Sequence, residues 1–377
     1  MVERRAAHAL HQCAAMASPY PWHYDLRWPW LHLRPSMRAH VELPRRPLAA
    51  RFGAARSIRR VIMFGDLMGL SGDRVPTASR AVQDTFARAD LVIGNCEAPV
   101  VREHNDAHAR YLANLSLGSQ YLRDFFARFA VDPARCVLSI ANNHAGDAGL
   151  DGLRETEARL GALGIQIAGV RDSQPAPLVV REVGGLRLGI AAWTTWMNSP
   201  LPSVSGVAGA AEAAAVDWRA QREALGLDTI VATPHWEWEF QHVPQPDTVA
   251  VARGLAAAGV DAIAGHHPHV IQPLAYLGDA ARPALCAFSL GNLFARTLTW
   301  PHRLGALLEL ELSADHDDAG GRGRVIAYRM HPTVQVGDGD RTRVVMLAEA
   351  PSRLRTRIEQ RLDRLFTSAR SSPCLAA

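Results

Sequence analysis

The chain has 377 residues, of which 48% are hydrophobic and 21% charged, as in an ordinary globular protein with a sizeable core. Its 41 basic side chains are all arginines, and the lack of lysine excludes a Schiff-base lysine and a GxxxxGK[ST] phosphate-binding loop. The arginines behind the net charge of +4 are dispersed, so we expect no nucleic-acid partner, whereas an anionic small substrate fits.

Residues 1–56 form the first predicted segment, an irregular N-terminal extension rich in aromatic residues and proline. The stretch Pro19–Pro35 shows neither a helical nor a strand period. We interpret it as a loosely ordered extension packed on the surface, with a docking role for its tyrosines and tryptophans as the alternative.

Residues 57–314 form the predicted main domain, in which short apolar runs alternate with helix-like segments. The apolar runs are Arg59–Asp66, Asp90–Glu97, Cys136–His144, Leu186–Trp193, Asp228–Trp236, Asp261–His269 and Ala284–Asn292. The helix-like segments are Ser79–Ala89, Tyr121–Phe129, Gly149–Leu163 and Asp247–Ala258. Nearly continuous apolar runs are typical of strands buried on both faces, so the pattern predicts an α/β fold with a mostly parallel sheet.

Residues 315–377 form the last predicted segment, a strand and an amphipathic helix packed on the main domain. The strand is expected over Arg324–Val336 and the arginine-rich helix over Pro351–Ser368. An alternating run, Ala306–Ala314, precedes them as another strand.

Residues able to bind a metal stand at the carboxyl ends of most predicted strands, where ligands gather in open α/β sheets. They are Asp66, Glu97, Asn143, His144, His235, His267 and His269. Carboxylate, amide and imidazole groups without a thiolate suit manganese, iron, zinc or magnesium. A carboxylate flanked by histidines is the layout of a two-metal hydrolytic site.

Several motifs extend this pattern, and they occur in one order along roughly residues 60–295. They are GDLM (Gly65–Met68), GNCE (Gly94–Glu97), ANNHAGDAGLDG (Ala141–Gly152), HWEWEF (His235–Phe240), GHHPHVIQ (Gly265–Gln272) and FSLGNLF (Phe288–Phe294). With them the chain resembles the CapA family of poly-γ-glutamate capsule-synthesis proteins, within the calcineurin-like metallophosphoesterase superfamily. The resemblance implies a four-layer sandwich of β-sheets flanked by helices.

The resemblance also implies roles for single residues. The implied metal ligands are Asp66, Glu97, Asn143, His235, His267 and His269, with Glu97 as the bridging carboxylate. The implied catalytic group comprises Asn143, His144 and Glu239. Residues expected to contact substrate or orient ligands are Asn95, Asp147, Glu237 and Asn292. The expected cofactor is one or two divalent ions, manganese, zinc or iron.

Two positions depart from the family pattern. Met68 stands where the wider superfamily has a histidine two residues after the first aspartate, so one metal position is short of a ligand. Glu237 stands where CapA-like proteins usually have glycine, and it could bind metal, repel an anionic substrate or point into solvent. His266 is left out of the ligand set because it is out of phase with His267 and His269 on an extended strand.

Two functions fit these observations. The first is a metal-dependent hydrolase acting on a phosphoester or a γ-glutamyl amide in poly-γ-glutamate capsule biosynthesis. The second is a non-catalytic protein that binds a polyglutamate-type polymer or a partner in the same cleft. No apolar stretch approaches the ~18 residues needed to cross a bilayer. We therefore expect a bacterial cytoplasmic protein without an integral membrane segment, with peripheral membrane association as the alternative; the oligomeric state is left open.

Overall fold

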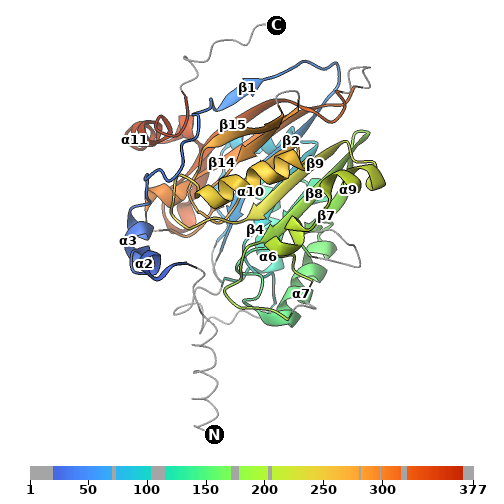
Figure 1. The fold of residues 1–377 in the computed structure, drawn as a ribbon. Helices are drawn as coiled ribbons and strands as arrows, with labels where there is room; N and C mark the ends of the chain where they lie inside the picture. Colours follow the sequence, from blue (N-terminus) through green and yellow to red (C-terminus); the bar gives the residue numbers. More distant parts are fainter. Residues whose placement is uncertain are drawn as a thin grey trace.

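A computed structural model describes residues 20–69, 74–102, 115–170, 178–202, 206–279, 282–297, 299–315 and 321–367 (Figure 1). Within these residues the larger sheet has ten strands in the order β3-β16-β15-β14-β2-β4-β5-β6, with β1 paired to β15 and β13 paired to β2. Their bounds are β1 Ala49–Arg51, β2 Ile58–Leu67, β3 Thr77–Ala78, β4 Leu91–Cys96, β5 Cys136–Ser139, β6 Gln166–Ala168, β13 Asn292–Phe294, β14 Leu304–Ser313, β15 Val325–Val336 and β16 Arg343–Met346.

The smaller sheet has six strands among the described residues, in the order β11-β12-β10-β9-β8-β7. They are β7 Leu178–Val183, β8 Leu186–Thr194, β9 Thr229–His235, β10 Ala262–Ala264, β11 Leu274–Asp279 and β12 Arg282–Ala287. In the larger sheet β2, β4, β5 and β6 run parallel, and in the smaller sheet β8, β9, β10 and β12 do. Strands β14, β15, β7 and β11 pair antiparallel with their neighbours. The prediction of a mostly parallel sheet therefore holds for the strands that lead to the candidate site, and antiparallel strands flank them.

Three apolar clusters arrange the sheets and helices into layers. Side chains of both sheets, such as Val61 and Ile190, share one cluster and so pack face to face. On the outer face of the larger sheet lie α4 (Arg80–Ala87), α6 (Ser119–Phe129) and α7 (Gly149–Ala162). On the outer face of the smaller sheet lie α8 (Ala210–Ala214), α9 (Trp218–Leu225) and α10 (Pro246–Ala257). This confirms the predicted four-layer sandwich of sheets flanked by helices.

The glycines of the motifs allow close contacts between strands at the end of the sandwich. A Cβ atom on Gly65 would lie 1.9 Å from the carbonyl oxygen of Gly291, and one on Gly265 would lie 2.0 Å from that of Phe288. Any larger residue would push these segments apart. The motif glycines therefore hold the polar residues beside them, such as Asp66, in one place.

The two predicted terminal segments are part of the same structure. Strand β1 pairs with β15, and β15 pairs with β14, so residues before 57 and after 314 belong to the larger sheet. The N-terminal segment also contains α2 (Trp22–Asp25) and α3 (Trp28–Leu33), so the expectation of an irregular extension is wrong there. The predicted C-terminal helix is α11 (Ser352–Leu362). The domain boundaries themselves stay a prediction.

An ion-pair cluster lies on β14, the neighbour of β2. The Glu309 carboxylate lies 2.8 Å from Arg88 Nη2 and 2.8 Å from His331 Nε2, and its side chain is only 9% exposed. Burial opposes ionisation, but the hydrogen bonds and charges of His331 and Arg88 outweigh it and lower the pKa of Glu309 from 4.5 to about 2. The ionised carboxylate therefore stabilises the fold.

We expect Glu309→Gln to lower the free energy of unfolding by about 1–3 kcal/mol at pH 7. A lowered folded-state pKa contributes stability above the unfolded-state pKa of 4.5 and loses it as pH falls toward about 2. The gap between the two proteins should therefore shrink over that range. Urea unfolding at several pH values measures this, and a gap that stays constant down to the acid end contradicts it.

Candidate metal centre

The predicted ligands converge where the carboxyl ends of the parallel strands of the two sheets meet. Asp66 is the penultimate residue of β2, Glu97 follows β4 directly, and His235 is the last residue of β9. His267 and His269 lie in the segment after β10. Asp66, Glu97, His235 and His267 are each at most 1% exposed, so the structure buries these polar groups together.

Glu97 lies at the centre of this cluster. It belongs to two groups of possible ligand atoms lying within 4.8 Å of one another, one with His235 and His267 and one with Asp66 and His269. It is fully buried, and neither of its carboxylate oxygens has a hydrogen-bond partner. A buried carboxylate without a partner is costly unless a cation neutralises it.

The segment after β10 holds its histidines in an unusual backbone conformation. His267 has φ of 95° and His269 has φ of 56°, in the left-handed region that non-glycine residues rarely adopt. Such strain, about 1–3 kcal/mol per residue, persists where the surroundings demand one geometry. Here the backbone N–H of His267 donates to Asp66 Oδ2 at 3.2 Å. The strained segment thus fixes the His267 backbone against Asp66, and the His269 ring lies beside the same carboxylate, with Nδ1 3.3 Å from Oδ2.

His266 also belongs to the centre, although the alternation of side chains expected on an extended strand excludes it from the predicted ligand set. Its Nδ1 lies 3.2 Å from Asp66 Oδ1, and the residue is 1% exposed. Neither of its ring nitrogens makes a well-aligned hydrogen bond. The predicted phase holds only for an extended strand, and it fails here because the next residue, His267, has a positive φ.

Asn143 and His144 lie in the loop after β5 rather than at the end of a strand, because β5 ends at Ser139. Asn143 Oδ1 lies 2.9 Å from His235 Nε2. His144 Nδ1 lies 2.7 Å from Asp147 Oδ2, and both side chains are at most 5% exposed. Asp147 therefore orients the His144 ring through Nδ1. The other ring nitrogen, Nε2, takes no part in this contact.

Two buried asparagines support Asp66. Asn95 Nδ2 donates to Asp66 Oδ1 at 2.8 Å. Asn142, which was not among the predicted site residues, donates from Nδ2 to Asn95 Oδ1 at 3.2 Å and accepts from the backbone N–H of His144 at 3.1 Å. This chain of hydrogen bonds connects the loop after β5 to the carboxylate on β2. The repeated asparagine in the ANNH motif is the sequence signal for it.

Asn292 orients His269. Its Oδ1 lies 3.1 Å from His269 Nδ1, and its Nδ2 donates to the His302 carbonyl at 2.9 Å. It is 1% exposed, and its strand β13 pairs with β2 at Asp66. Of the two roles expected from the sequence, these contacts fit the orientation of a ligand; Asn292 also lines the cavity described next.

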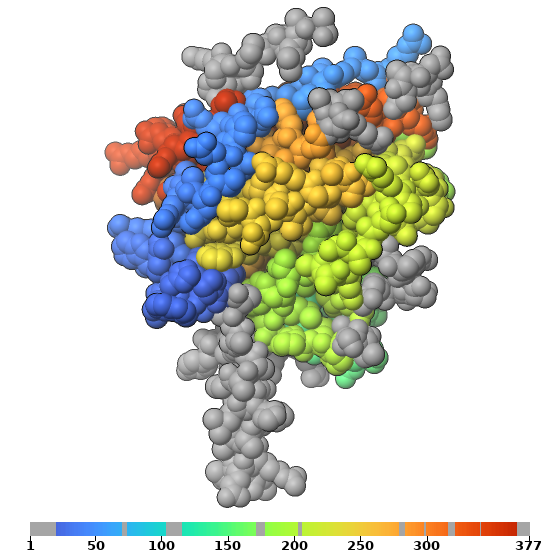
Figure 2. Space-filling model, viewed as in Figure 1, coloured from blue at the N-terminus to red at the C-terminus, as the bar shows by residue number. Residues whose placement is uncertain are grey.

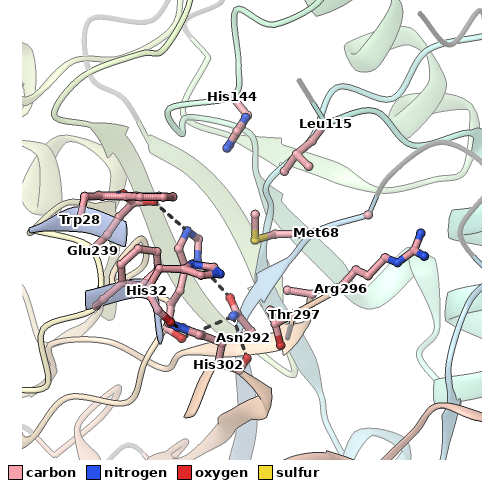
Figure 3. Close-up of a pocket in the computed structure, with 14 residues that line it drawn as sticks. Trp28, His32, Met68, Leu115, His144, Glu239, Asn292, Arg296, Thr297 and His302 are labelled. Atoms are coloured by element: carbon pink, nitrogen blue, oxygen red, sulfur yellow. Dashed lines mark hydrogen bonds and ion pairs between the residues drawn. The ribbon is translucent and has the colours of Figure 1, made fainter. Parts of the chain in front are cut away.

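A cavity of about 250 Å³ opens beside the centre (Figure 3). His144 stands on one side of it, while Trp28, His32 and Glu239 stand on another, as Figure 3 shows. Met68 lines the wall between them. Arg296 also lines the cavity, and its positive charge is opposite to that of an anionic substrate.

The N-terminal segment forms part of this site. The Tyr20 hydroxyl lies 2.7 Å from His267 Nε2, and Tyr24 and Trp28 donate hydrogen bonds to the backbone carbonyl and the carboxylate of Glu239. Tyr24 is 3% exposed. The expectation of a loosely ordered extension is therefore wrong for these aromatic residues. No spacing rule predicts a contact across 247 positions.

Burial and neighbouring charges set the protonation of the cluster. Burial and the neighbouring histidines hold the pKa of His235 and of His267 well below the usual value, so both rings are neutral. Burial opposes ionisation of Asp66, but the contacts with His266 and His269 outweigh it and hold the pKa of Asp66 well below its usual value. Burial and the charges of Asp66 and Glu239 raise the pKa of Glu97. Neutral imidazoles and ionised carboxylates are the forms that bind metals. His235, His267 and Asp66 are shifted toward these forms, whereas the raised pKa of Glu97 and of His269 means that a bound ion would have to displace protons from them.

These residues fit a divalent ion. Glu97 offers two buried oxygens without a hydrogen bond, and His266 Nε2 and His267 Nδ1 are ring nitrogens without one. A cation would satisfy these atoms and neutralise the adjacent carboxylates at once. The donors are carboxylate and imidazole without a thiolate, which suits manganese, zinc or iron.

Glu237 has a different environment from the rest. It is 6% exposed, and its carboxylate accepts hydrogen bonds from the backbone N–H groups of Trp238 at 3.0 Å and of Gln245 at 2.9 Å. Gln245 is the N-cap of α10. Glu237 therefore does not point into solvent, and it stabilises the start of a helix. Its φ of 77° lies in the left-handed region, where a glycine would carry no steric cost.

We expect Glu237→Ala to lower the free energy of unfolding by about 1–2 kcal/mol, because it loses both hydrogen bonds and keeps the backbone strain. Glu237→Gly loses the same bonds but relieves the strain, so its stability should lie between those of the alanine variant and the parent. Thermal unfolding of the three proteins measures the order. A glycine variant less stable than the alanine variant contradicts it.

The fold and this cluster define an α/β sandwich with a buried site suited to a divalent metal. The family model described as "Bacterial capsule synthesis protein PGA_cap" matches residues 61–297, and the chain belongs to this family. This confirms the resemblance stated from the motifs. In the described residues no helix has both the length and the apolar character that a membrane span requires.

Two curated relatives carry the CapA name. The chain is 26% identical to "Capsule biosynthesis protein CapA" of Bacillus anthracis over 238 residues, covering 56% of this chain and 52% of that protein. It is also 26% identical to "PGA biosynthesis protein CapA" of Bacillus subtilis over 219 residues, covering 56% and 54%. The chain thus spans about half the length of these relatives.

Among solved structures, similar folds include a putative 5'-nucleotidase from Staphylococcus aureus, with 16% identity and a TM-score of 0.44 over 81% of this chain and 59% of that one. A 5'-nucleotidase precursor from Thermus thermophilus has 18% identity and a TM-score of 0.42 over 74% and 54%. At these levels of identity the likeness concerns the fold alone.

Proposed function

We propose that this chain is a metal-dependent hydrolase that acts on an anionic substrate in the biosynthesis of a poly-γ-glutamate capsule. The observation that carries this proposal is Glu97, fully buried with both carboxylate oxygens unpartnered and with His235 and His267 beside it. Asp66, Asn143 and His269 complete the proposed ligand set. A divalent ion bound there would polarise a substrate oxygen and lower the pKa of a water molecule.

The residues around the cavity supply the rest of the proposed chemistry. His144 lines the cavity, and Asp147 fixes its Nδ1, so its Nε2 can pass a proton to the leaving group. Asn95 and Asn292 hold Asp66 and His269 in place through hydrogen bonds. Glu239 stands 3.7 Å from His269 Nε2 and receives a hydrogen bond from Trp28, so we propose that it positions His269 rather than transferring a proton.

A screen tests the reaction class. The metal-free protein is supplied with manganese, zinc or iron and offered phosphomonoesters, phosphodiesters and γ-linked glutamate oligomers. We expect metal-dependent release of phosphate or glutamate that is lost in Glu97→Gln and greatly reduced in His144→Ala. Turnover that is the same with and without metal would reject the proposal.

One observation favours the alternative, a non-catalytic protein that binds the polymer in the same cleft. Met68 lines the cavity at the position where the wider superfamily has a histidine ligand. A protein of this kind would bind γ-linked oligomers and metal, yet show no turnover with any substrate in the screen. A cytoplasmic location also stays a prediction, which separation of membranes from soluble protein would test.

A further inference from the structure

A second cavity, of about 520 Å³, adjoins the wall of the site cavity. We call it the arginine pocket. It is formed by the segment after α3, by the 3-10 helix η3 (Trp300–Arg303) with Thr299 before it, and by α11. Its charged lining residues are Arg34, Arg357 and Arg361. All of its lining residues lie outside the stretch that the family model matches, 61–297.

Within the described part of the chain, the arginines of this pocket have no acidic partner. The guanidinium carbons of Arg357 and Arg361 lie 5.1 and 4.9 Å from the centre of the Trp300 ring. No carboxylate of the described residues forms an ion pair with Arg34, Arg357 or Arg361. Two like charges held on one ring repel each other, so an anion between them is favoured.

A neutral histidine holds one of these arginines. Arg361 Nη1 lies 2.8 Å from His242 Nε2, while His242 Nδ1 lies 2.8 Å from the Ile271 carbonyl oxygen. Burial and the charge of Arg361 lower the pKa of His242 to about 3, so this histidine is uncharged. The contact therefore orients the guanidinium without neutralising it. Arg361 keeps a positive charge for a ligand.

Thr299 adds a hydrogen-bonding group to the lining. Its hydroxyl oxygen is buried and has no hydrogen-bond partner in the structure. An orphaned hydroxyl beside three guanidinium groups is a further donor for an oxyanion. A planar carboxylate fits this set because a guanidinium can donate two parallel hydrogen bonds to it.

The same two segments line both cavities. His32 and His302 face the site cavity, while their neighbours Arg34 and Trp300 face the arginine pocket. The surface view shows the N-terminal segment running beside the C-terminal helix (Figure 2), where Arg45 donates to the Asp363 carbonyl at 2.8 Å. The pocket is therefore built from segments before residue 61 and after residue 297, two of which also line the site cavity.

We propose that the arginine pocket binds carboxylates of an anionic polymer whose reacting unit lies in the site cavity. This inference rests on the proposed function for its substrate class. It adds a second binding site, outside the metal centre. This site binds the negative charges of the polymer on units beyond the reacting one. A free inorganic anion such as phosphate could also bind to the arginines. The experiment therefore compares the polymer with inorganic phosphate.

The test measures binding of a short labelled γ-linked glutamate oligomer to the full chain by fluorescence anisotropy, with chelator present so that no metal contributes. Arg34 and Arg357 are exposed, so the double variant Arg34→Gln/Arg357→Gln should fold. We expect it to bind roughly tenfold more weakly than the parent, as expected for two lost ion pairs. Arg353→Gln, an exposed arginine of α11 that does not line the pocket, should bind like the parent.

Competition and turnover complete the test. Unlabelled oligomer should displace the probe at far lower concentration than inorganic phosphate, and a γ-linked oligomer whose α-carboxylates are converted to carboxamides should not displace it. Equal displacement by phosphate, or a double variant that binds like the parent, overturns the inference. Pocket-dependent binding without turnover in any metal would reject the hydrolase and leave the pocket standing. Turnover by the parent, together with unchanged oligomer binding in the double variant, would reject the pocket and leave the hydrolase standing.

Discussion

The Glu97→Gln variant is expected to lose high-affinity metal binding, with a Kd raised by more than about 100-fold. Glu97 is the residue shared by the two proposed ligand groups, with His235 and His267 on one side and Asp66 and His269 on the other. Residues that only orient a ligand typically change affinity by roughly 10- to 100-fold, so a shared ligand should exceed that range. Hydrolysis should fall to background in the same variant.

The same substitution separates a metal ligand from a structural residue. Without metal, Glu97→Gln should be no less stable than the parent, because it removes a buried carboxylate that has no partner. With metal at about 100 times the Kd, the parent should gain about 2.7 kcal/mol and the variant almost nothing. Glu223→Gln, at an exposed position of α9, is the control and should gain as the parent does. A variant that is destabilised equally with and without metal contradicts a role for Glu97 as a ligand.

The His144→Ala variant is expected to lose about 10²- to 10⁴-fold in kcat while still binding metal. His144 lines the cavity, and its Nδ1 is held at 2.7 Å by Asp147, which is the arrangement of an oriented general acid. Asp147→Asn keeps the shape but removes the charge that orients the ring, so we expect a smaller loss, roughly 10- to 100-fold. Metal titration and steady-state kinetics on all three proteins measure the effect.

Metal titration beside the kinetics distinguishes an acid from a structural histidine. A structural role predicts that His144→Ala loses stability or metal affinity together with kcat, whereas an acid predicts a loss of kcat alone. An alanine variant that folds and binds metal as the parent does and keeps the parental kcat would exclude His144 as the acid.

Much of the site could be predicted from sequence because its residues follow apolar strands that the sequence marks clearly. Asp66, Glu97 and His235 all stand at or just after the carboxyl ends of parallel strands, which the fold brings together at one end of the sandwich. The motif glycines also indicate the site in the sequence. Gly65 and Gly265 lie so close to neighbouring backbone that no residue with a Cβ would fit there. Local pattern and fold agree at these positions.

Other parts could not be predicted, for identifiable physical reasons. His266 was excluded by an alternation that holds for extended backbone, whereas the chain turns into the left-handed region at His267. Tyr20 and Trp28 reach the site through contacts between distant parts of the chain, which periodicity does not encode. Glu237 is expected in the site because it lies in the HWEWEF motif beside His235. Its carboxylate instead accepts a hydrogen bond from the start of the helix that follows.

Calorimetric titration of the metal-free parent and of Glu97→Gln with manganese and zinc decides whether the metal centre exists. We predict one or two ions per parent chain and no high-affinity binding in the variant. A folded parent chain that binds neither ion, or a variant that binds as tightly as the parent, would contradict the metal centre.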